Sequence, residues 1–332
     1  MKIRGLRTLK LSACWLRSRF TGGALILGYH RVAEPVWDPY GLCVSPHCFA
    51  QQLEAVRELA NPIALPALVQ ALREGRVPPR AVAVTFDDGY ADLLTHAKPL
   101  LERFEIPATV FVPSGYLGLE FWWDELARIV RPSNPLPASL ALEISGQRFE
   151  WSTGGAENNP RRRKSLLFAL YNVLLPLPET ERQQALERIR SWASPSDGGQ
   201  PDSRAMTPEE LVELCADGLV DIGSHTATHP VLAALPPAVQ QLEIHGSKTR
   251  LEELIRRPVT SFSYPNGSTS AQTSALVREA GFTCACASHS DVARAVSDPH
   301  LLPRFWIPDS DAVRFRRWLN RWLHGPVMET AA

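Results

Sequence analysis

The chain has 332 residues, with 35 basic and 35 acidic side chains and a formal net charge of zero. This balance argues against general binding to nucleic acid, which depends on a basic face. The length and a hydrophobic content of 45% suit a single α/β barrel with insertions. Because no stretch of about 18 apolar residues occurs, no segment is predicted to cross a bilayer.

The first 23 residues form a basic amphipathic segment, in which charges alternate with apolar and aromatic side chains. Its basic residues are Lys2, Arg4, Arg7, Lys10, Arg17 and Arg19. Two interpretations are open: a peripheral contact of residues 1–20 with an anionic membrane surface, or a first helix packed on the barrel. A signal peptide is not expected, because Arg17 and Arg19 interrupt any apolar run.

The six cysteines form no CxxC pair and no spacing typical of a zinc ribbon. We therefore expect all of them to be reduced residues that contribute to packing. Reduced cysteines agree with a location in the cytoplasm or at the inner face of the membrane.

Seven short apolar runs, each followed by a helical pattern, predict buried strands. They are residues 24–29, 82–86, 108–112, 220–223, 259–264, 282–287 and 304–307. Strands that alternate with helices imply a parallel sheet, and seven of them imply a barrel or near-barrel.

Helical patterns with clear signals occupy three of the intervals. These helices are predicted over residues 93–104, 207–218 and 237–256. Pro99 inside the first predicts a kink. Thr207 and Glu210 form a capping box that begins the second, and Gly218 ends it.

Residues 120–205 interrupt the alternation and are interpreted as an insertion between strands rather than a second domain. Trp122 and Trp123 open an amphipathic helix there, and we expect them in the core rather than stacked on sugar rings. The basic run 161–164 is interpreted as a solvated helix start rather than a polyanion site.

Two adjacent carboxylates, Asp87 and Asp88, follow the strand 82–86, and Gly89 after them permits a sharp turn. Such a pair is costly at the end of a buried strand unless something binds between the carboxylates or pairs with them. A metal ion would do so. A helix N-cap formed by the pair is the alternative explanation.

His225 and His229 follow the strand 220–223, where a helical turn would place both rings on one face. Alone, two exposed loop histidines would explain this spacing equally well. However, the carboxyl ends of parallel strands share one rim of a barrel. His30, the two aspartates, His225 and Tyr264 all fall at such strand ends, so we predict one site there.

Asp88, His225 and His229 would offer three ligands to a divalent metal ion and leave coordination positions open, as in catalytic zinc sites. Zn²⁺ is the expected ion, and Co²⁺, Ni²⁺, Fe²⁺ and Mn²⁺ suit the same donors. Such an ion lowers the pKa of bound water from about 15.7 toward 7 and polarises a carbonyl. Asp87 would then act as the general base, which indicates a hydrolase with one metal.

Three motifs resemble those of the polysaccharide deacetylases, the NodB-homology enzymes of carbohydrate esterase family four. They are Thr-Phe-Asp-Asp-Gly at 85–89, Ser-His-Thr-Ala-Thr-His at 224–229 and Phe-Ser-Tyr-Pro-Asn-Gly at 262–267. The resemblance covers residues 24–310 and leaves 311–332 as a C-terminal helix and tail. It implies an α/β fold, the deformed (β/α)7 barrel, and metal-dependent removal of N-acetyl or O-acetyl groups from a glycan.

The resemblance also implies roles for individual residues. Asp87 would be the base, and the ligands would be the three already named. A loop would wall the sugar site, with the backbone N–H of Tyr264 helping the metal to hold the oxyanion. That loop consists of Tyr264, Pro265, Asn266 and Gly267.

Two departures from the family pattern concern the general acid and the residue that orients the base. The late Leu-x-His motif is missing, but Leu-Gly-Tyr-His at 27–30 resembles it, as in exopolysaccharide deacetylases with circularly permuted motifs. His30 is therefore the expected acid. A histidine that merely caps the strand is the alternative, with His289 and His300 as the next candidates for the acid.

The family's arginine before the Tyr-Pro loop has no clear counterpart, since Arg256 and Arg257 end the preceding helix. Arg304, counted with the loop among the substrate-site residues, is placed to reach Asp87 from another strand. A surface ion pair is the alternative for Arg304.

The predicted function is removal of acetyl groups from N-acetylhexosamine units of a surface or exported glycan, or of its lipid-linked precursor. Deformylation or xylan-type O-deacetylation at the same site is the nearest alternative. A non-catalytic glycan-binding homologue is another, although the intact set of Asp87 and the three metal ligands favours turnover.

Overall fold

The computed structural model describes residues 23–153, 159–193 and 203–324, and the chain divides into two compact units. The barrel unit contains the described residues up to Glu34, Leu42–Leu117, and those from Met206 onward. The inserted unit contains Pro35–Gly41 and the described part of Gly118–Ala205.

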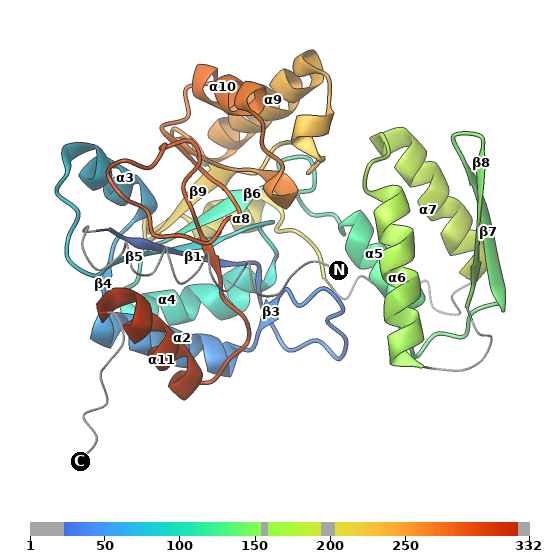
Figure 1. Cartoon of the computed structure of the whole chain (residues 1–332), viewed down its shortest axis with the longest axis horizontal. Coiled ribbons are helices and arrows are strands. Elements are labelled where there is room, and N and C mark those ends of the chain that lie inside the picture. Colours follow the sequence, from blue (N-terminus) through green and yellow to red (C-terminus); the bar gives the residue numbers. More distant parts are fainter. Residues whose placement is uncertain (1–22, 154–158, 194–202, 325–332) are drawn as a thin grey trace. The chain divides into compact units, whose positions relative to one another are not determined.

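A parallel sheet in the order β11-β10-β9-β6-β5-β1-β12 forms the centre of the barrel unit, and β4 pairs with β5. Of these strands, Figure 1 labels β1, β4, β5, β6 and β9. The strands are β1 (Leu25–Tyr29), β4 (Asn61–Pro62), β5 (Ala81–Phe86), β6 (Ala108–Val112), β9 (Val220–Ser224), β10 (Ser261–Ser263), β11 (Cys284–Cys286) and β12 (Phe305–Trp306). All seven predicted strands are present, although several are shorter than the apolar runs that predicted them.

The two edges of this sheet approach each other through one segment. Leu302 forms a parallel bridge with Cys286 of β11, and three residues later β12 pairs with β1. The sheet is therefore curled into the deformed barrel expected from the motifs, which confirms the predicted fold class. Two short strands that follow β1 in the chain, β2 (Arg31–Val32) and β3 (Cys43–Val44), form a separate parallel pair.

Helices follow most strands of the barrel unit. They are α2 (Pro46–Leu59), α3 (Leu65–Glu74), η1 (Leu93–Ala97), α4 (Lys98–Phe104), α8 (Pro208–Leu214), η2 (Leu232–Ala234), α9 (Pro237–Ile255), η3 (Pro265–Gly267), α10 (Ala271–Glu279) and α11 (Ala312–His324). The helix predicted over 93–104 changes from a π-helix to an α-helix just before Pro99, which lacks the N–H that would continue the first pattern.

The capping box of Thr207 and Glu210 is present at the start of α8. The helix ends at Leu214, earlier than the predicted Gly218, because Cys215 already leaves the helical conformation. The start of this helix could be predicted because its cap is formed by nearby residues of the sequence. Its end could not, because the end of a helix depends on packing.

Side chains of the strands alternate between two cores. On β5, Val82, Val84 and Phe86 join the large core that the helices cover. Ala81 and Ala83 face the smaller core, which includes Phe111 of β6 and Leu302. If the alternation continues past the end of β5, the side chain of Asp87 points to the same face as Ala81 and Ala83.

Apart from Pro35–Gly41, the inserted unit lies in the chain between β6 and β9. It contains α5 (Trp122–Val130), an antiparallel hairpin of β7 (Ser139–Ile144) and β8 (Gln147–Ser152), α6 (Pro160–Leu174) and α7 (Glu179–Ala193). We expected an insertion rather than a second domain. The region is inserted between two strands, and it forms a compact unit of its own. Trp122 and Trp123 are buried, as predicted. The basic run opens α6, although its Arg163 is buried rather than solvated.

Several expectations fall at or beyond the edges of the described residues. Residues 1–22 and Cys14 lie outside them, and the five remaining cysteines are all free. The expected C-terminal helix is α11, whereas residues 325–332 lie outside the described part. None of the described helices is both long and apolar enough to pass through a bilayer.

Candidate functional site

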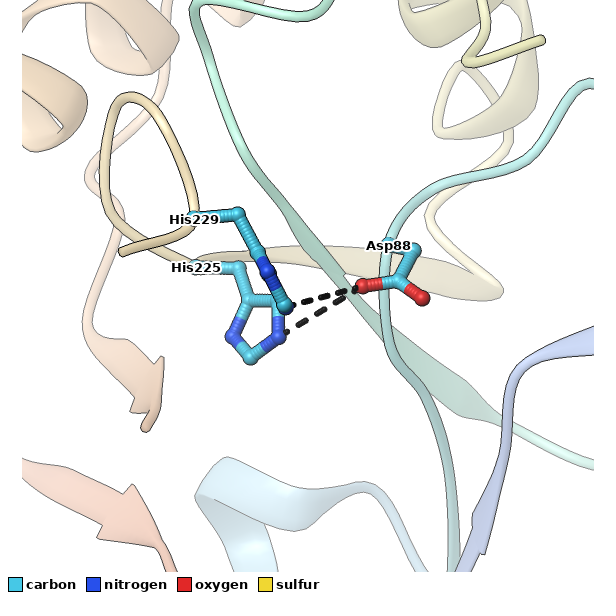
Figure 2. Close-up of side chains that lie close together, drawn as sticks. All are labelled: Asp88, His225 and His229. Atoms are coloured by element: carbon cyan, nitrogen blue, oxygen red, sulfur yellow. Dashed lines mark ion pairs between the residues drawn. The ribbon is translucent and has the colours of Figure 1, made fainter. Parts of the chain in front are cut away.

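The predicted ligands Asp88, His225 and His229 lie together just beyond the carboxyl ends of β5 and β9 (Figure 2). Asp88 Oδ1 is 3.6 Å from Nε2 of His225 and 3.4 Å from Nε2 of His229. All three side chains are buried. The structure therefore brings together the three residues that the sequence assigned to one site.

The backbone around these residues adopts positive φ angles at several positions. Asp88 has a φ of 71° and Gly89 one of 64°, which turns the Asp88 carboxylate toward the histidines. Thr226 and His229 have φ angles of 66° and 54°. Residues 225–229 therefore form a loop, and the helical turn predicted between the two histidines is wrong.

Glu243 of α9 holds this loop in place. Its carboxylate accepts hydrogen bonds from the backbone N–H groups of Ala227 and Thr228, at 2.9 and 2.8 Å, and from the Thr228 hydroxyl at 2.7 Å. Hydrogen bonds to an ionised acceptor are stronger than neutral ones. Sequence reasoning missed Glu243, because no local pattern connects a helix residue with a loop that precedes the helix.

The geometry of the three side chains fits a divalent metal ion. Two ligands at about 2.0–2.1 Å from a tetrahedral ion lie about 3.3–3.4 Å from each other. The measured 3.4 and 3.6 Å separations are close to this value and too long for good hydrogen bonds.

The state of His225 also suits metal binding. Its Nδ1 lies 2.7 Å from the carbonyl oxygen of Ser263, which fixes the ring and leaves Nε2 directed at the cluster. Burial lowers the pKa of His225 despite the opposing charge of Asp87, so the ring is held neutral. A neutral imidazole is the form that binds a metal.

Asp87 lies beside this cluster with both of its oxygens engaged. Arg304 donates from Nη1 to Oδ1 at 2.7 Å and from Nη2 to Oδ2 at 2.8 Å, and the Ser263 hydroxyl donates to Oδ2 at 3.1 Å. Oδ2 is also 3.7 Å from Nε2 of His225. Burial, the largest single effect, would raise the pKa of Asp87, but the charge and hydrogen bonds of Arg304, together with the nearby histidines, outweigh it and bring that pKa well below its ordinary range.

Arg304 is fully buried and reaches Asp87 from the segment that closes the barrel. Burial by itself would lower the pKa of Arg304. The charge of Asp87 and its hydrogen bonds raise this pKa by more than burial lowers it, so the guanidinium remains charged. The arginine expected to orient the base thus occupies that position, and the surface alternative is wrong. Ser263, which accepts from Arg304 at 2.8 Å, was missed although it lies inside the third motif.

His30 follows β1, and its ring stacks on Trp306 with centroids 4.5 Å apart and planes 17° apart. The guanidinium carbon of Arg304 lies 4.6 Å from the centroid of the Trp306 indole. Gly28 leaves the space for this indole, since a Cβ at that position would meet it at 2.8 Å. His30 is also among the groups whose charge, when present, lowers the pKa of Asp87, so it lies within electrostatic reach of that carboxylate.

The loop from Tyr264 to Gly267 differs from the expectation. The Tyr264 N–H donates to the carbonyl of Cys286 at 3.3 Å, because this residue still follows the register between β10 and β11. Its buried hydroxyl donates to the carbonyl of His300 at 2.9 Å. The role of oxyanion donor assigned to the Tyr264 N–H is therefore not supported.

The remaining residues of the loop form a tight turn. Pro265 is buried and Asn266 has a φ of 55°. Gly267 lies against Ser288, which a Cβ would approach to 2.7 Å. Their assignment to the substrate site stays a prediction.

The two other histidines considered for the acid differ in their surroundings. His300 is buried with Nε2 2.9 Å from the carbonyl oxygen of Phe282, which is a packing role. His289 is exposed, and its carbonyl accepts the N–H of Arg304 at 3.0 Å. His30 therefore remains the candidate.

The family model described as polysaccharide deacetylase matches residues 74–134 and 189–285. The chain thus carries a domain of the polysaccharide deacetylase family, which confirms the resemblance drawn from its motifs. The matched segments contain Asp87, Asp88, His225 and His229, whereas His30 and Arg304 lie outside them.

The curated relatives of this chain include poly-β-1,6-N-acetyl-D-glucosamine N-deacetylases. The protein from Escherichia coli (strain K12) is 32% identical over 95 residues, which are 28% of this chain and 14% of that protein. The protein from Staphylococcus aureus (strain N315) is 28% identical over 110 residues, covering 29% of this chain and 38% of that protein. The chain therefore spans well under half the length of these relatives.

Solved structures share the fold over most of the chain. IcaB from Ammonifex degensii superposes with a TM-score of 0.59 at 20% identity, covering 90% of this chain and 97% of that one. The Streptococcus pyogenes deacetylase PplD, solved in complex with acetate, gives a TM-score of 0.58 at 18% identity and covers 88% and 96%. At these identities the similarity establishes the fold alone.

Proposed function

We propose that this chain is a metal-dependent polysaccharide N-deacetylase that acts on N-acetylhexosamine units, with a polymer of the poly-β-1,6-N-acetyl-D-glucosamine type as its substrate. The observation that carries the proposal is the buried group of Asp88, His225 and His229 beside an ionised Asp87. The names of the curated relatives point to the same substrate class.

Asp88, His225 and His229 would hold the ion, for which Zn²⁺ is the expected species and Co²⁺, Ni²⁺, Fe²⁺ and Mn²⁺ are alternatives. A bound divalent ion supplies Lewis acidity, which polarises a carbonyl and makes water easier to deprotonate. The protein's own contribution is the fixed direction of these side chains, through Ser263 for His225 and through Glu243 for the loop.

Asp87 is the group that takes the proton from the attacking water. An ionised carboxylate offers about four lone-pair sites, and Arg304 and Ser263 occupy three of them. The remaining site is on Oδ1. Because Arg304 keeps the pKa of Asp87 low, the carboxylate is ready as a base without first losing a proton.

His30 would give a proton to the leaving amine when the C–N bond of the acetamide breaks. The reaction then consumes one water and releases acetate and the free amine of the sugar. Trp306 fixes the plane of the His30 ring by stacking, and the same indole lies against Arg304. Arg304 thus positions the base Asp87 and Trp306 positions the acid His30, and both residues belong to one short segment.

The test is acetate release from acetylated oligosaccharides, measured for the purified full chain with chelator and with each candidate metal added back. We expect release from β-1,6-linked N-acetylglucosamine oligomers that stops with chelator and returns with metal. Acetylated xylan and an N-formylated hexosamine serve as comparison substrates. Turnover only on xylan or only on the formyl substrate would replace the proposed function, and tight glycan binding without turnover would indicate a binding protein.

A further inference from the structure

A shielded ion pair begins at the residue that directly follows His30 in the chain. Arg31 donates from Nε to Oδ2 of Asp92 at 2.8 Å, and only 12% and 11% of the two side chains are exposed. An exposed ion pair contributes little to stability, whereas a shielded one is costly to break. No step of the proposed deacetylation uses this pair, so it is a separate feature to explain.

The same carboxylate also holds the backbone one residue further along. The N–H of Val32 donates to Oδ1 of Asp92 at 3.3 Å. The carbonyl oxygen of Val32 lies 2.8 Å from Nδ1 of His96. Because a carbonyl oxygen can only accept, Nδ1 of His96 carries the proton in this contact. Side chains of a single segment, residues 92–96, therefore hold both backbone groups of Val32.

The pairing of β1 with β5 supports the chain up to His30 and ends there. The last paired residues are Tyr29 and Phe86. One further hydrogen bond, from the N–H of Asp87 to the carbonyl of Tyr29 at 2.9 Å, follows this register. His30 is thus the first residue after the part of β1 that β5 holds.

Beyond His30, side chains take the place of a neighbouring strand. β2 forms a two-stranded sheet with β3, in which the N–H groups of Arg31 and Ala33 donate to carbonyl groups in and next to β3. Successive N–H groups of a strand point to opposite sides, so the N–H of Val32 points away from β3. Asp92 accepts it on that side.

The segment that contains Asp92 also carries the proposed base and a metal ligand. Asp92 comes four residues after Asp88. Tyr90 lies between them in the chain, and its buried ring has its centroid 4.7 Å from the guanidinium carbon of Arg31. Residues 87–92 therefore hold the chain on both sides of His30, through the N–H of Asp87 before it and the carboxylate of Asp92 after it.

The metal ligands are held by other contacts. The N–H of Met206 donates to the carbonyl of Gly89 at 2.9 Å, which supports the turn that carries the aspartate ligand. Ser263 and Glu243 hold the ring of one histidine ligand and the loop of both. Removal of the Asp92 carboxylate should therefore disturb the acid more than the metal.

We propose that Asp92 is a positioning residue for the acid His30. Its contacts with Arg31 and Val32 fix the backbone from which the imidazole reaches the leaving amine. Stacking on Trp306 fixes the plane of the ring, whereas Asp92 fixes the place of its Cα atom. A general acid must lie within hydrogen-bond distance of the leaving nitrogen, and a misplacement of about 1 Å costs on the order of 10²-fold in rate. This inference rests on the proposed function.

The experiment compares Asp92→Ala with a matched control, Glu252→Ala. Glu252 makes the same two kinds of contact, since it accepts from Nζ of Lys248 at 2.7 Å and from the N–H of Val259 at 2.9 Å. Val259 comes before β10, so this contact lies at the amino end of a strand, whereas the site lies at the carboxyl ends. Asp92→Asn is a second variant, which keeps an oxygen that can accept from Val32.

Each variant is assayed for acetate release from β-1,6-linked N-acetylglucosamine oligomers, cleavage of an activated aryl acetate, bound metal and thermal unfolding. We expect Asp92→Ala to keep stoichiometric metal and to lose about 10- to 100-fold on the amide. Its loss on the aryl acetate should be much smaller, because the phenolate leaves without a proton. Asp92→Asn should recover part of the amide rate, and Glu252→Ala should match the unchanged chain on both substrates.

A double variant establishes whether Asp92 acts through His30. The acid is already absent in His30→Ala, so the addition of Asp92→Ala should not lower the amide rate further. A residue that only stabilises the fold would add a loss of its own.

Four results would overturn the proposal: loss of metal from Asp92→Ala, equal losses on both substrates, rates that match Glu252→Ala, or losses that add in the double variant. If Asp92→Ala does not fold, Asp92→Asn is judged by the same criteria. An unchanged chain that releases no acetate from the amide would instead contradict the proposed function, and this inference with it.

Discussion

The barrel unit and the inserted unit each bury an arginine, and the two residues differ in what surrounds the guanidinium. Arg304 in the barrel unit forms two hydrogen bonds to Asp87 and one to Ser263. Arg163 in the inserted unit donates to the carbonyl of Asn134 at 2.8 Å, and its Nε and Nη1 have no hydrogen-bond partner among the described residues.

The pKa values of the two arginines follow this difference. Burial lowers the pKa of Arg163, and no carboxylate compensates. Burial also lowers the pKa of Arg304, but Asp87 more than reverses the effect. A buried charge therefore indicates a working site only when a second charge and a set of directed donors accompany it. Within the described residues, the one group of metal-ligating side chains lies next to the Arg304 pair.

The inserted unit is held by packing of a different kind. Trp122 stacks on Tyr171 with centroids 5.0 Å apart, and Arg182 lies over the Trp122 ring at 5.1 Å. Tyr40 donates from its hydroxyl to the carbonyl of Trp123 at 2.9 Å, which ties residues 35–41 into this unit. Aromatic packing of this kind stabilises a fold but directs no group toward a reacting atom.

The largest effect is expected from His229→Ala, which removes a ligand from the metal group. Loss of a residue that only orients a ligand already costs about 10–100-fold in metal affinity or activity. Loss of the ligand itself should cost more, and the variant should retain no metal after dialysis. Elemental analysis and acetate release measure both properties, with His289→Ala as the control. Stoichiometric metal in His229→Ala would contradict the assignment.

His30→Ala should slow amide cleavage by about 10²–10⁴-fold, the usual contribution of a general acid or base. An activated aryl acetate should be affected much less, because its phenolate leaves without a proton. Rates on both substrates, measured with the metal content, separate the two cases. Equal losses on both would give His30 a structural role, in which case the stack on Trp306 would serve packing alone.

Arg304→Gln and Arg163→Gln test the comparison directly. Removing one member of a buried ion pair costs about 3–5 kcal/mol of unfolding free energy. Because the pKa of folded Asp87 is lowered, the pair stabilises the protein above the unfolded pKa of about 3.9 and loses this effect as the pH falls through the folded pKa.

Without Arg304, burial raises the pKa of Asp87, so the acid limb of the pH–rate profile should move to higher pH. Arg163→Gln should leave that limb in place. Thermal unfolding and pH–rate profiles of both variants provide the measurement. An unmoved acid limb in Arg304→Gln would show that the arginine does not govern the base.

The smallest effect in this series is expected from Glu243, which acts on the ligands through the loop. Glu243→Ala removes three hydrogen bonds and should weaken metal binding by about 10–100-fold. Glu243→Gln keeps a carbonyl acceptor and should recover part of the affinity. Metal titration of both variants decides this, and identical losses would mean that the negative charge, not the geometry, matters.

The positions of Asp87, Asp88 and His225 could be predicted because these residues directly follow a strand. Asp87 and Asp88 follow β5, and His225 follows β9. Strand alternation also explains Arg304: its neighbour Phe305 joins the core under the helices, so Arg304 faces the opposite way and reaches Asp87. Local patterns were sufficient wherever the side-chain direction is fixed by the sheet.

The sequence was insufficient where distant residues decide the conformation. The loop between His225 and His229 takes positive φ angles because Glu243 of α9 binds its backbone. The N–H of Tyr264 remains in the sheet because Cys286 of β11 accepts it. Neither partner is close in the chain. Spacing therefore predicted a helical turn that the structure lacks, and the family resemblance implied an oxyanion donor whose N–H the sheet already engages.

The most direct test of the account is the metal content of Asp87→Asn and Asp88→Asn, measured together with acetate release. The two aspartates are adjacent in the chain, yet the structure gives one to Arg304 and the other to the histidines. Asp87→Asn should keep stoichiometric metal and lose about 10²–10⁴-fold in turnover, whereas Asp88→Asn should lose both. Loss of metal from Asp87→Asn with retention in Asp88→Asn would reverse the two roles and contradict the account.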